Sequence, residues 1–423
     1  MSLKSRFLNI LFWSVISAAF IGPGTLTTAS TAGAMFKFEL IWALAFATVA
    51  CIALQEMAAR ITIASGMEIG NTIKMTTGFS WLAYFIGFGV IFGCAAYEAG
   101  NILGALAGVQ LLLEADRIIL TIIIGIACAL LLWLGTVKTI VNLLGVMVAV
   151  MGIAFCYVAW QAELSLSEIG QGMSFSIPEG SEWLILGLVG TTIVPYNLFL
   201  GSGISHGQSI KNMRFGLVVS VVLGGIVSIA ILITGTKIDG TISFQNLAIA
   251  MGDSLGNSAK VMLALGLFAA GFTSSITAPL AAGVLAKSIA GTKKEHIYKR
   301  IWQAVLMAGL IFGISEVKPI PVIIAAQALN GMILPMVAIL LIIQANNARL
   351  IGSQYMNSKW FNVLSLIILN IVLLIGLNNI FKAATNALGL AATDETVRLI
   401  YLQILALPLM VFTIYKIWQL RKN

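Results

Sequence analysis

Long apolar stretches separated by short polar segments account for most of the chain. Each stretch has about 18 or more residues, which is enough to cross roughly 30 Å of hydrocarbon as an α-helix. The alternating segments of about ten residues that are typical of a membrane β-barrel do not occur. We therefore predict about twelve membrane-spanning helices. Their approximate ranges are 10–34, 39–64, 79–110, 117–135, 139–160, 183–205, 213–236, 258–288, 298–315, 319–345, 360–380 and 397–418.

The composition agrees with this pattern. Hydrophobic residues make up 59% of the 423 residues and charged residues only 9%. A soluble domain carries roughly a quarter charged residues, so this chain cannot cover a water-facing surface. The predicted fold class is an all-α polytopic membrane protein, and the lipid bilayer is its first expected partner. The four cysteines fall inside spans without metal-ligand spacing, so we expect neither disulfides nor a resident metal or other cofactor.

The distribution of Lys and Arg predicts the orientation, because cytoplasmic loops are enriched in these residues. Seventeen of the 24 lie on one side of the predicted spans and seven on the other. We expect a multi-pass protein of the cell (plasma or inner) membrane, functional as a monomer, with both termini in the cytoplasm. The basic segment 291–300 then indicates a short cytoplasmic loop, so no nucleic-acid partner is expected.

Two of the predicted spans are interrupted near their middle. The first contains Ile21-Gly22-Pro23-Gly24-Thr25, and the sixth contains Ile193-Val194-Pro195-Tyr196-Asn197. Proline removes a backbone donor and disturbs the preceding turn. Backbone groups freed at membrane depth are tolerated only against protein or a polar cavity. Paired interruptions in two halves of a chain point to the binding site of a secondary transporter.

The breaks also suggest the domain organisation. The longest polar connection, about 161–182, lies between the fifth and sixth spans, where two five-helix units would join. We predict a transporter core over 1–345, made of inverted repeats at about 10–160 and 183–345. Two additional C-terminal helices are expected within 346–423.

Several motifs resemble the Nramp family of proton-coupled divalent-metal transporters, which has the LeuT-like 5+5 inverted-repeat fold with discontinuous helices one and six. The likeness runs from the first span to about residue 358. The strongest matches are Leu54-Gln55-Glu56-Met57-Ala58-Ala59-Arg60, Gly266-Leu267-Phe268-Ala269-Ala270-Gly271 with Thr273-Ser274-Ser275, Ala326-Gln327-Ala328-Leu329-Asn330-Gly331, and Asn346-Asn347 through Asn357.

The sequence departs from this family where the metal would bind. The family has Asp-Pro-Gly-Asn at the first break, where this chain has Gly22-Pro23-Gly24-Thr25, and Met-Pro-His at the second, where this chain has Val194-Pro195-Tyr196. A later histidine of that helix is replaced by Gly201. Of the family's central ligand set, only the glutamine of the tenth span survives, as Gln327.

The residues left at the breaks favour a different substrate. Transition metals bind imidazole, sulfur or carboxylate donors, and none of these stands at either break. The second half of each broken helix begins near 24–26 or 196–198, where free amide groups and the helix dipole favour an anion. We expect a small anion or polar solute such as bicarbonate, a short carboxylate or an amino acid. The predicted substrate-binding residues are Gly22, Pro23, Gly24, Thr25, Thr28, Val194, Pro195, Tyr196, Asn197 and Gln327.

Five further residues are candidates for coupling or gating. Glu98 is the one acid predicted well inside the hydrocarbon, and Asn101 lies one turn further along the same span. Glu98 is expected to take up a proton or contribute to a Na⁺ site, or else to make a structural hydrogen bond. His206, at the cytoplasmic end of the sixth span, is structural or a proton relay. Glu56 and Arg60, four residues apart, would form a helix-stabilising or an inner-gate ion pair.

Three other functions remain open from the sequence. The first keeps the family's substrate, a divalent cation bound by Glu98, Gln327, Thr25 and carbonyl groups. The second is a homologue that no longer transports and serves as a sensor or scaffold, against which the two costly breaks argue. An enzyme is the least expected, because no nucleophile–base pair is recognisable.

Overall fold

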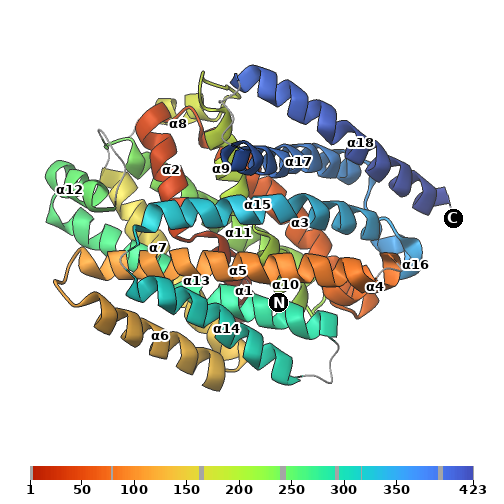
Figure 1. The fold of residues 1–423 in the computed structure, drawn as a ribbon, viewed down its shortest axis with the longest axis horizontal. Helices are drawn as coiled ribbons and strands as arrows, with labels where there is room; N and C mark the ends of the chain where they lie inside the picture. The colour runs from red at the N-terminus through yellow and green to blue at the C-terminus, as the bar shows by residue number, and fades with distance from the viewer. Residues whose placement is uncertain are drawn as a thin grey trace.

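The computed structural model describes residues 3–77, 80–161, 166–238, 244–290, 295–315, 317–388 and 394–422. Helices make up nearly all of these ranges (Figure 1). The elements in chain order are α1 (Leu3–Phe20), α2 (Pro23–Phe36), α3 (Ile41–Ser65), α4 (Ile69–Thr77), α5 (Ser80–Gln110), α6 (Arg117–Leu134), α7 (Val137–Gln161), α8 (Leu166–Gly172), α9 (Glu182–Thr192), α10 (Pro195–Ile204), α11 (Ile210–Gly235), α12 (Phe244–Leu255), α13 (Asn257–Ala290), α14 (Glu295–Ile314), α15 (Pro319–Gln344), α16 (Ala348–Ile351), the 3₁₀ turn η1 (Ser353–Tyr355), α17 (Lys359–Leu388) and α18 (Glu395–Lys422).

The predicted spans are confirmed to within a few residues at most ends. In the described part of the chain, 11 helices are long and apolar enough to cross a membrane, or up to 12 if the bent pair α1 and α2 forms one span. The short helices α4, α8, α12 and α16 were not predicted, because they lie in polar connections without an apolar run. Lys293 and Lys294 of the predicted basic loop lie outside the described residues.

Both predicted interruptions are present. Helix α1 ends at Phe20 and α2 begins at Pro23, with the two axes bent by 68°. Helix α9 ends at Thr192 and α10 begins at Pro195, so that only two residues separate them. In both cases proline is the first residue of the second half, where its missing N–H breaks no helical bond.

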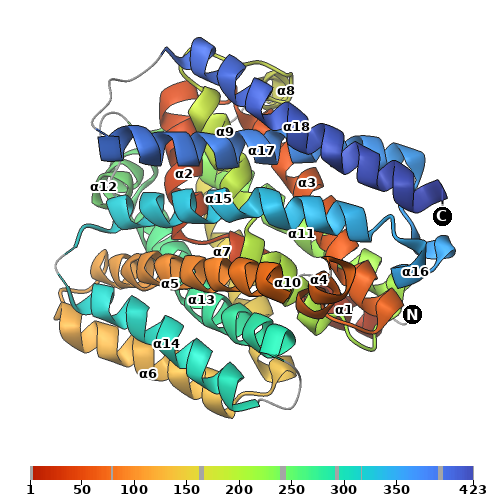
Figure 2. The ribbon, with the colours of Figure 1, turned by 45° about the vertical axis from the view of Figure 1, so that its right-hand side comes forward.

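The broken helices lie in the middle of the bundle. Figures 1 and 2 show α2, α9 and α10 surrounded by α3, α5, α11, α13 and α15, with α6, α14 and α18 outside. In the most apolar window of Glu182–Ile204, which contains α9 and α10, 83% of residues are buried, compared with 22% for Val397–Lys422 in α18. The centre is therefore sequestered from lipid, whereas α18 has lipid for most of its surroundings.

Small residues bring the helices that line the centre close together. A side chain on Gly108 of α5 would collide with the backbone of Phe268 in α13, and one on Gly271 of α13 with the backbone of Ala105 in α5. Close backbone approach through small residues is a common way for membrane helices to associate. It places Glu98 and Asn101 of α5 beside the Ser274-Ser275 pair of α13.

Candidate substrate site between two broken helices

The second half of the first broken span begins without a cap. Gly22 is the N-cap residue of α2 and offers no side chain to accept from the first-turn amides, and Pro23 has no N–H. The amide of Leu26 donates to the Gly22 carbonyl at 3.1 Å, so Leu26 is not among the free donors, contrary to expectation. The uncapped amides are those of Gly24 and Thr25, both buried. A buried helix end of this kind is where a ligand is expected.

The end of α1 is instead fully engaged by hydroxyl groups. The carbonyl of Ala18 accepts from Ser274 Oγ at 3.2 Å, and that of Phe20 accepts from Thr25 Oγ1 at 2.5 Å. The carbonyl of Ala19 accepts from the Tyr196 hydroxyl at 2.8 Å. Three different helices therefore supply donors to the negative end of this half-helix. These carbonyl groups already accept hydrogen bonds from the protein, so they are poor ligands for a cation in this structure.

The second break repeats the uncapped start. Val194 is the N-cap of α10 and has no acceptor side chain, and Pro195 follows it. The Asn197 amide donates to the Val194 carbonyl at 3.1 Å, which removes it from the predicted free donors. The Asn197 side chain donates to the Ile16 carbonyl at 3.0 Å. Tyr196 and Asn197 thus both hold α1 in this structure, and they position the first break rather than face open space.

A small cavity lies against the uncapped end of α2. Its volume is about 10 Å³, which is room for about one water molecule. The Tyr97 hydroxyl is buried there without a hydrogen-bond partner. The residues that line the cavity are Gly24, Tyr97, Gly100, Asn101, Ile323 and Ala326. The site is closed, and a larger ligand would require the surrounding helices to move.

Gln327 borders the same place, as predicted from its position in the tenth span. A Cβ atom added to Gly24 would lie 2.5 Å from Gln327 Nε2, so only glycine lets this amide come so near the α2 backbone. The Thr28 hydroxyl lies 3.4 Å from both Oε1 and Nε2 of Gln327. The predicted residues Gly24, Thr28 and Gln327 are therefore neighbours.

Glu98 is completely buried and packs against Gly309 of α14, outside the lining of this cavity. Its Oε2 accepts from Asn101 Nδ2 at 3.5 Å. The Ser275 hydroxyl, from α13, is also buried and lies beside this carboxyl group. His206, the other coupling candidate, is partly exposed, and its Nε2 lies 3.6 Å from Glu68 Oε1. Glu98 and Asn101 therefore lie in the protein interior, whereas His206 lies at a partly exposed position.

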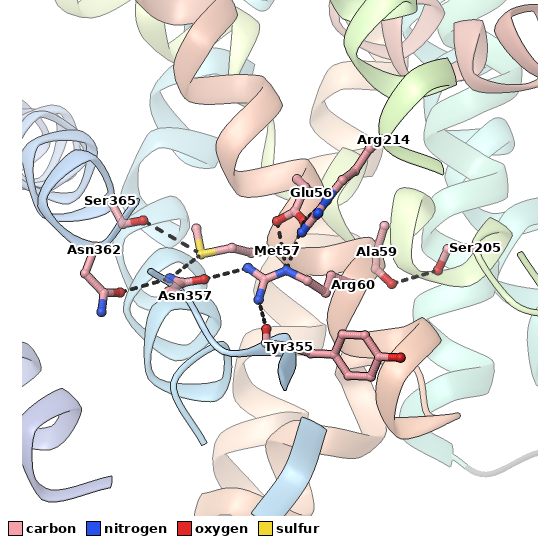
Figure 3. A network of polar contacts seen from close by, with 10 residues as sticks. All are labelled: Glu56, Met57, Ala59, Arg60, Ser205, Arg214, Tyr355, Asn357, Asn362 and Ser365. Atoms are coloured by element: carbon pink, nitrogen blue, oxygen red, sulfur yellow. Dashed lines mark hydrogen bonds and ion pairs between the residues drawn. The ribbon is translucent and has the colours of Figure 1, made fainter. Parts of the chain in front are cut away.

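The predicted gate pair belongs to a larger polar network (Figure 3). Arg60 Nε donates to both carboxylate oxygens of Glu56 at 3.0 Å, and Arg214 of α11 reaches Glu56 Oε1 at 2.8 Å. Arg60 also donates to the Tyr355 carbonyl and, at 2.5 Å, to Asn357 Oδ1. The network joins α3, α11, η1 and the segment that follows it. We call its residues, Glu56, Arg60, Arg214, Tyr355 and Asn357, the Arg60 network.

A metal centre was sought among the usual ligands. Within the described ranges, no three or more His, Cys, Asp or Glu residues lie close enough together to hold a metal ion. The space beside Gly201 of α10 is filled by the Gln55 side chain, whose Oε1 has no other partner. The central site is thus made of backbone amides, hydroxyl groups and carboxamides, with Glu98 as a nearby acid.

Comparison with known proteins identifies the family. The sequence profile described as "Natural resistance-associated macrophage protein-like", Nramp, matches residues 14–382. The chain belongs to the Nramp family. The "Divalent metal cation transporter MntH" of Yersinia pestis is 24% identical to it over 383 residues, which cover 86% of this chain and 92% of the relative.

Solved structures show the fold of this Nramp protein to be LeuT-like. A variant of the Eremococcus coleocola manganese transporter superposes with a TM-score of 0.79 at 19% identity, covering 99% of this chain and 96% of the other. MhsT in complex with L-phenylalanine superposes with a TM-score of 0.61 at 14% identity, covering 88% and 98%. The resemblance inferred from the motifs is therefore confirmed for family and fold.

Several residues at this Nramp site had no predicted role. Ser274 stood inside a quoted segment and Tyr97 directly precedes Glu98, but nothing in their spacing indicated that Ser274 would bond α1 and Tyr97 would line the cavity. Arg214 was one of the basic residues counted for the orientation. Ser274 reaches Ala18 across 256 residues, and Arg214 reaches Glu56 across 158.

Proposed function

We propose that this Nramp-family membrane transporter carries a small anion or polar solute, with bicarbonate, a short carboxylate and an amino acid as the candidate classes. The observation that supports it most directly is the pair of uncapped, buried helix starts at Gly22-Pro23 and Val194-Pro195. Backbone amides at such positions, with the positive end of the helix dipole, bind carboxylates and other anions.

The polar groups around the first break have the corresponding character. The Tyr97 hydroxyl and the Gln327 amide can donate to an anion, and Gly24 lets it approach the backbone. The carbonyl groups at the end of α1, which would attract a cation, already accept hydrogen bonds from the protein. A 2+ ion held at this depth without several anionic ligands is strongly unfavourable. The proposed loss of the family's metal site explains why donors surround the first break and why the carbonyl groups at the end of α1 are already hydrogen-bonded.

A divalent metal cation is the second candidate, and the names of the relatives favour it more directly than an anion. The Yersinia pestis relative is named a divalent metal cation transporter, and the Eremococcus coleocola protein a manganese transporter. In this case Glu98 and Gln327 would supply side-chain oxygens, and the helices would rearrange to bring them together with Thr25. One carboxylate near the centre makes such a site weak for Mn²⁺ and better suited to a partly hydrated ion.

Glu98 is our candidate for coupling the transport to H⁺ or Na⁺. Its carboxyl group is fully buried, and the groups beside it, the Asn101 carboxamide and the Ser275 hydroxyl, are neutral. A carboxyl group in this setting can exchange a proton or bind Na⁺ as the surrounding helices move. His206, which pairs with Glu68 at a partly exposed position, is a weaker candidate.

The proposed orientation follows from the distribution of Lys and Arg. We propose that both termini are cytoplasmic, that the core comprises 1–345 with two additional helices in 346–423, and that a monomer transports. The Arg60 network would then lie on the cytoplasmic side of the centre and would separate when the site opens inward. Cysteine-accessibility labelling of intact cells at the chain ends tests the orientation.

The decisive experiment compares substrates in one preparation. Purified protein in proteoliposomes is supplied with labelled bicarbonate, acetate, amino acids or Mn²⁺, and uptake is measured with and without H⁺ or Na⁺ gradients. Saturable uptake of an anion or amino acid, without Mn²⁺ uptake, is the expected result. Saturable Mn²⁺ uptake that Glu98→Gln abolishes, with no anion transport, would overturn the anion proposal in favour of the second candidate.

A further inference from the structure

A deep groove runs along the outside of the bundle between α18 and the core. Its volume is about 530 Å³, and it is lined by residues of α4, α5, α15, α18 and the turn after α15. It is separate from the central site and contains none of the predicted substrate residues.

The groove is polar at one end and apolar at the other. Thr76, Gln344 and Gln419 stand near the C-terminal ends of α4, α15 and α18, which meet at this end of the bundle. Met336 and Leu409 mark the deep end. From Met336 to Gln344, the last residue of α15, the groove extends about 12 Å along the helix. This is most of the roughly 15 Å of hydrocarbon in one leaflet.

Each of the two helices that border the groove contains an internal proline. Pro335 of α15 and Pro408 of α18 directly precede the lining residues Met336 and Leu409. An interior proline lacks the backbone donor of a regular helix and disturbs the preceding turn. Pro335 packs against Gly376 of α17. Both prolines therefore stand at the apolar end of the groove.

Lys416 supplies the one full charge among the lining residues. Its ammonium group donates to Gln419 Oε1 at 3.1 Å, which holds it at the polar end, and two of its three donors remain for a ligand. The salt bridges found among the described residues do not include it. Arg421 and Lys422 follow in the last turn of α18 but do not line the groove, so Lys416 is the basic residue placed to contact a bound headgroup.

We propose that this groove binds one anionic phospholipid, with its headgroup at Lys416 and an acyl chain along Leu340 and Phe412. The groove covers most of the depth of one leaflet, it lies on the outside of the bundle, and the single charge at the polar end is complementary to a phosphate group. Basic residues at a membrane surface attract anionic lipid with a free energy of about 1 kcal/mol each. A zwitterionic lipid of the same chain length would fill the apolar part, but the cation of its headgroup offsets the phosphate charge, so it would gain less at Lys416.

The site also has a connection to the rest of the protein. Arg421, two residues beyond Gln419, donates to Asn346 Oδ1 at 3.2 Å and to the Asn357 carbonyl at 2.9 Å. Asn357 in turn holds Arg60. A lipid that orders the end of α18 therefore stabilises the segment on which the Arg60 network depends.

Native mass spectrometry of the full chain tests the proposal. The purified protein is titrated with phosphatidylglycerol or phosphatidylcholine of identical acyl chains, and bound lipid is counted. We expect one phosphatidylglycerol to bind more tightly than phosphatidylcholine, and Lys416→Gln to weaken its binding about fivefold. The matched control Lys422→Gln removes the same charge from the same helix at a residue whose ammonium lies over the Trp418 ring and does not line the groove, and it should leave this binding unchanged.

A second pair of variants tests the apolar part. Leu340→Trp fills the groove and should abolish the tightly bound lipid, whereas Val411→Trp, on an exposed position of α18 that does not line the groove, should not. Equal binding of the two lipids to the wild-type protein would overturn the proposal. So would equal effects of Lys416→Gln and Lys422→Gln, or full lipid binding by Leu340→Trp.

Discussion

Removing the charge of Glu56 should destabilise the protein far more than removing that of Arg214, although both belong to the same network. The Arg60 side chain is only 3% exposed and depends on Glu56 for its counter-charge, with the Nε–H group shared between both carboxylate oxygens at 3.0 Å. The Arg214 side chain is 56% exposed and is solvated when its partner is lost. Glu56→Gln keeps the shape of the side chain and leaves the Arg60 guanidinium buried without its anion.

The magnitudes follow from this difference in burial. Breaking a buried ion pair by neutralising one partner costs about 3–5 kcal/mol, because the other charge stays uncompensated. An exposed pair contributes about 0–1 kcal/mol. We therefore expect about 3–5 kcal/mol of destabilisation for Glu56→Gln and at most about 1 kcal/mol for Arg214→Gln. The double variant Glu56→Gln/Arg60→Met should cost less than the sum of its two single variants, with a coupling energy of about 2–3 kcal/mol.

Unfolding by titration with dodecyl sulfate in mixed micelles, followed by tryptophan fluorescence, measures these differences. The four variants and the wild-type protein are compared at one micelle composition. The reasoning is refuted if Glu56→Gln costs no more than Arg214→Gln. It is equally refuted if the effects of Glu56→Gln and Arg60→Met are additive. Each substitution removes the same ion pair, so the second should cost less once the first has been made.

Three further substitutions test the central site. Gly24→Ala pushes the Gln327 amide away from the α2 backbone and should lower uptake about 10- to 100-fold in proteoliposomes. Gly190→Ala, whose added carbon would meet only an ordinary contact, should transport normally, and equal uptake by the two variants would contradict the assignment. Glu98→Gln should make the uptake rate independent of an imposed pH gradient, and retention of the full dependence would exclude it as the proton carrier. Tyr196→Phe leaves a buried carbonyl unpaired and should cost about 1–3 kcal/mol in the same unfolding titration, so a loss below about 0.5 kcal/mol would show that this bond is unimportant.

The sequence alone was sufficient to predict the fold class, because the requirements of a lipid environment apply to each membrane span separately. Each span had to satisfy its own backbone groups and present an apolar surface, so hydrophobic length gave the helices to within a few residues at most ends. Proline at Pro23 and Pro195 located both breaks, since its missing donor acts within a single turn. The quoted motifs added the family, which the profile match over residues 14–382 confirms.

The partners of the polar groups were decided only by the tertiary structure. Nothing near Tyr196 in the sequence indicates that its hydroxyl is used by Ala19, 177 residues away, or that Ser274 bonds the adjacent carbonyl of Ala18. In the bilayer interior a backbone carbonyl freed at a helix end needs a donor, but which donor it finds depends on how the helices cross. The residue types at the breaks could therefore be predicted from the sequence. Which polar groups remain free for a ligand could not, because this depends on which of them bond to other helices in the folded bundle.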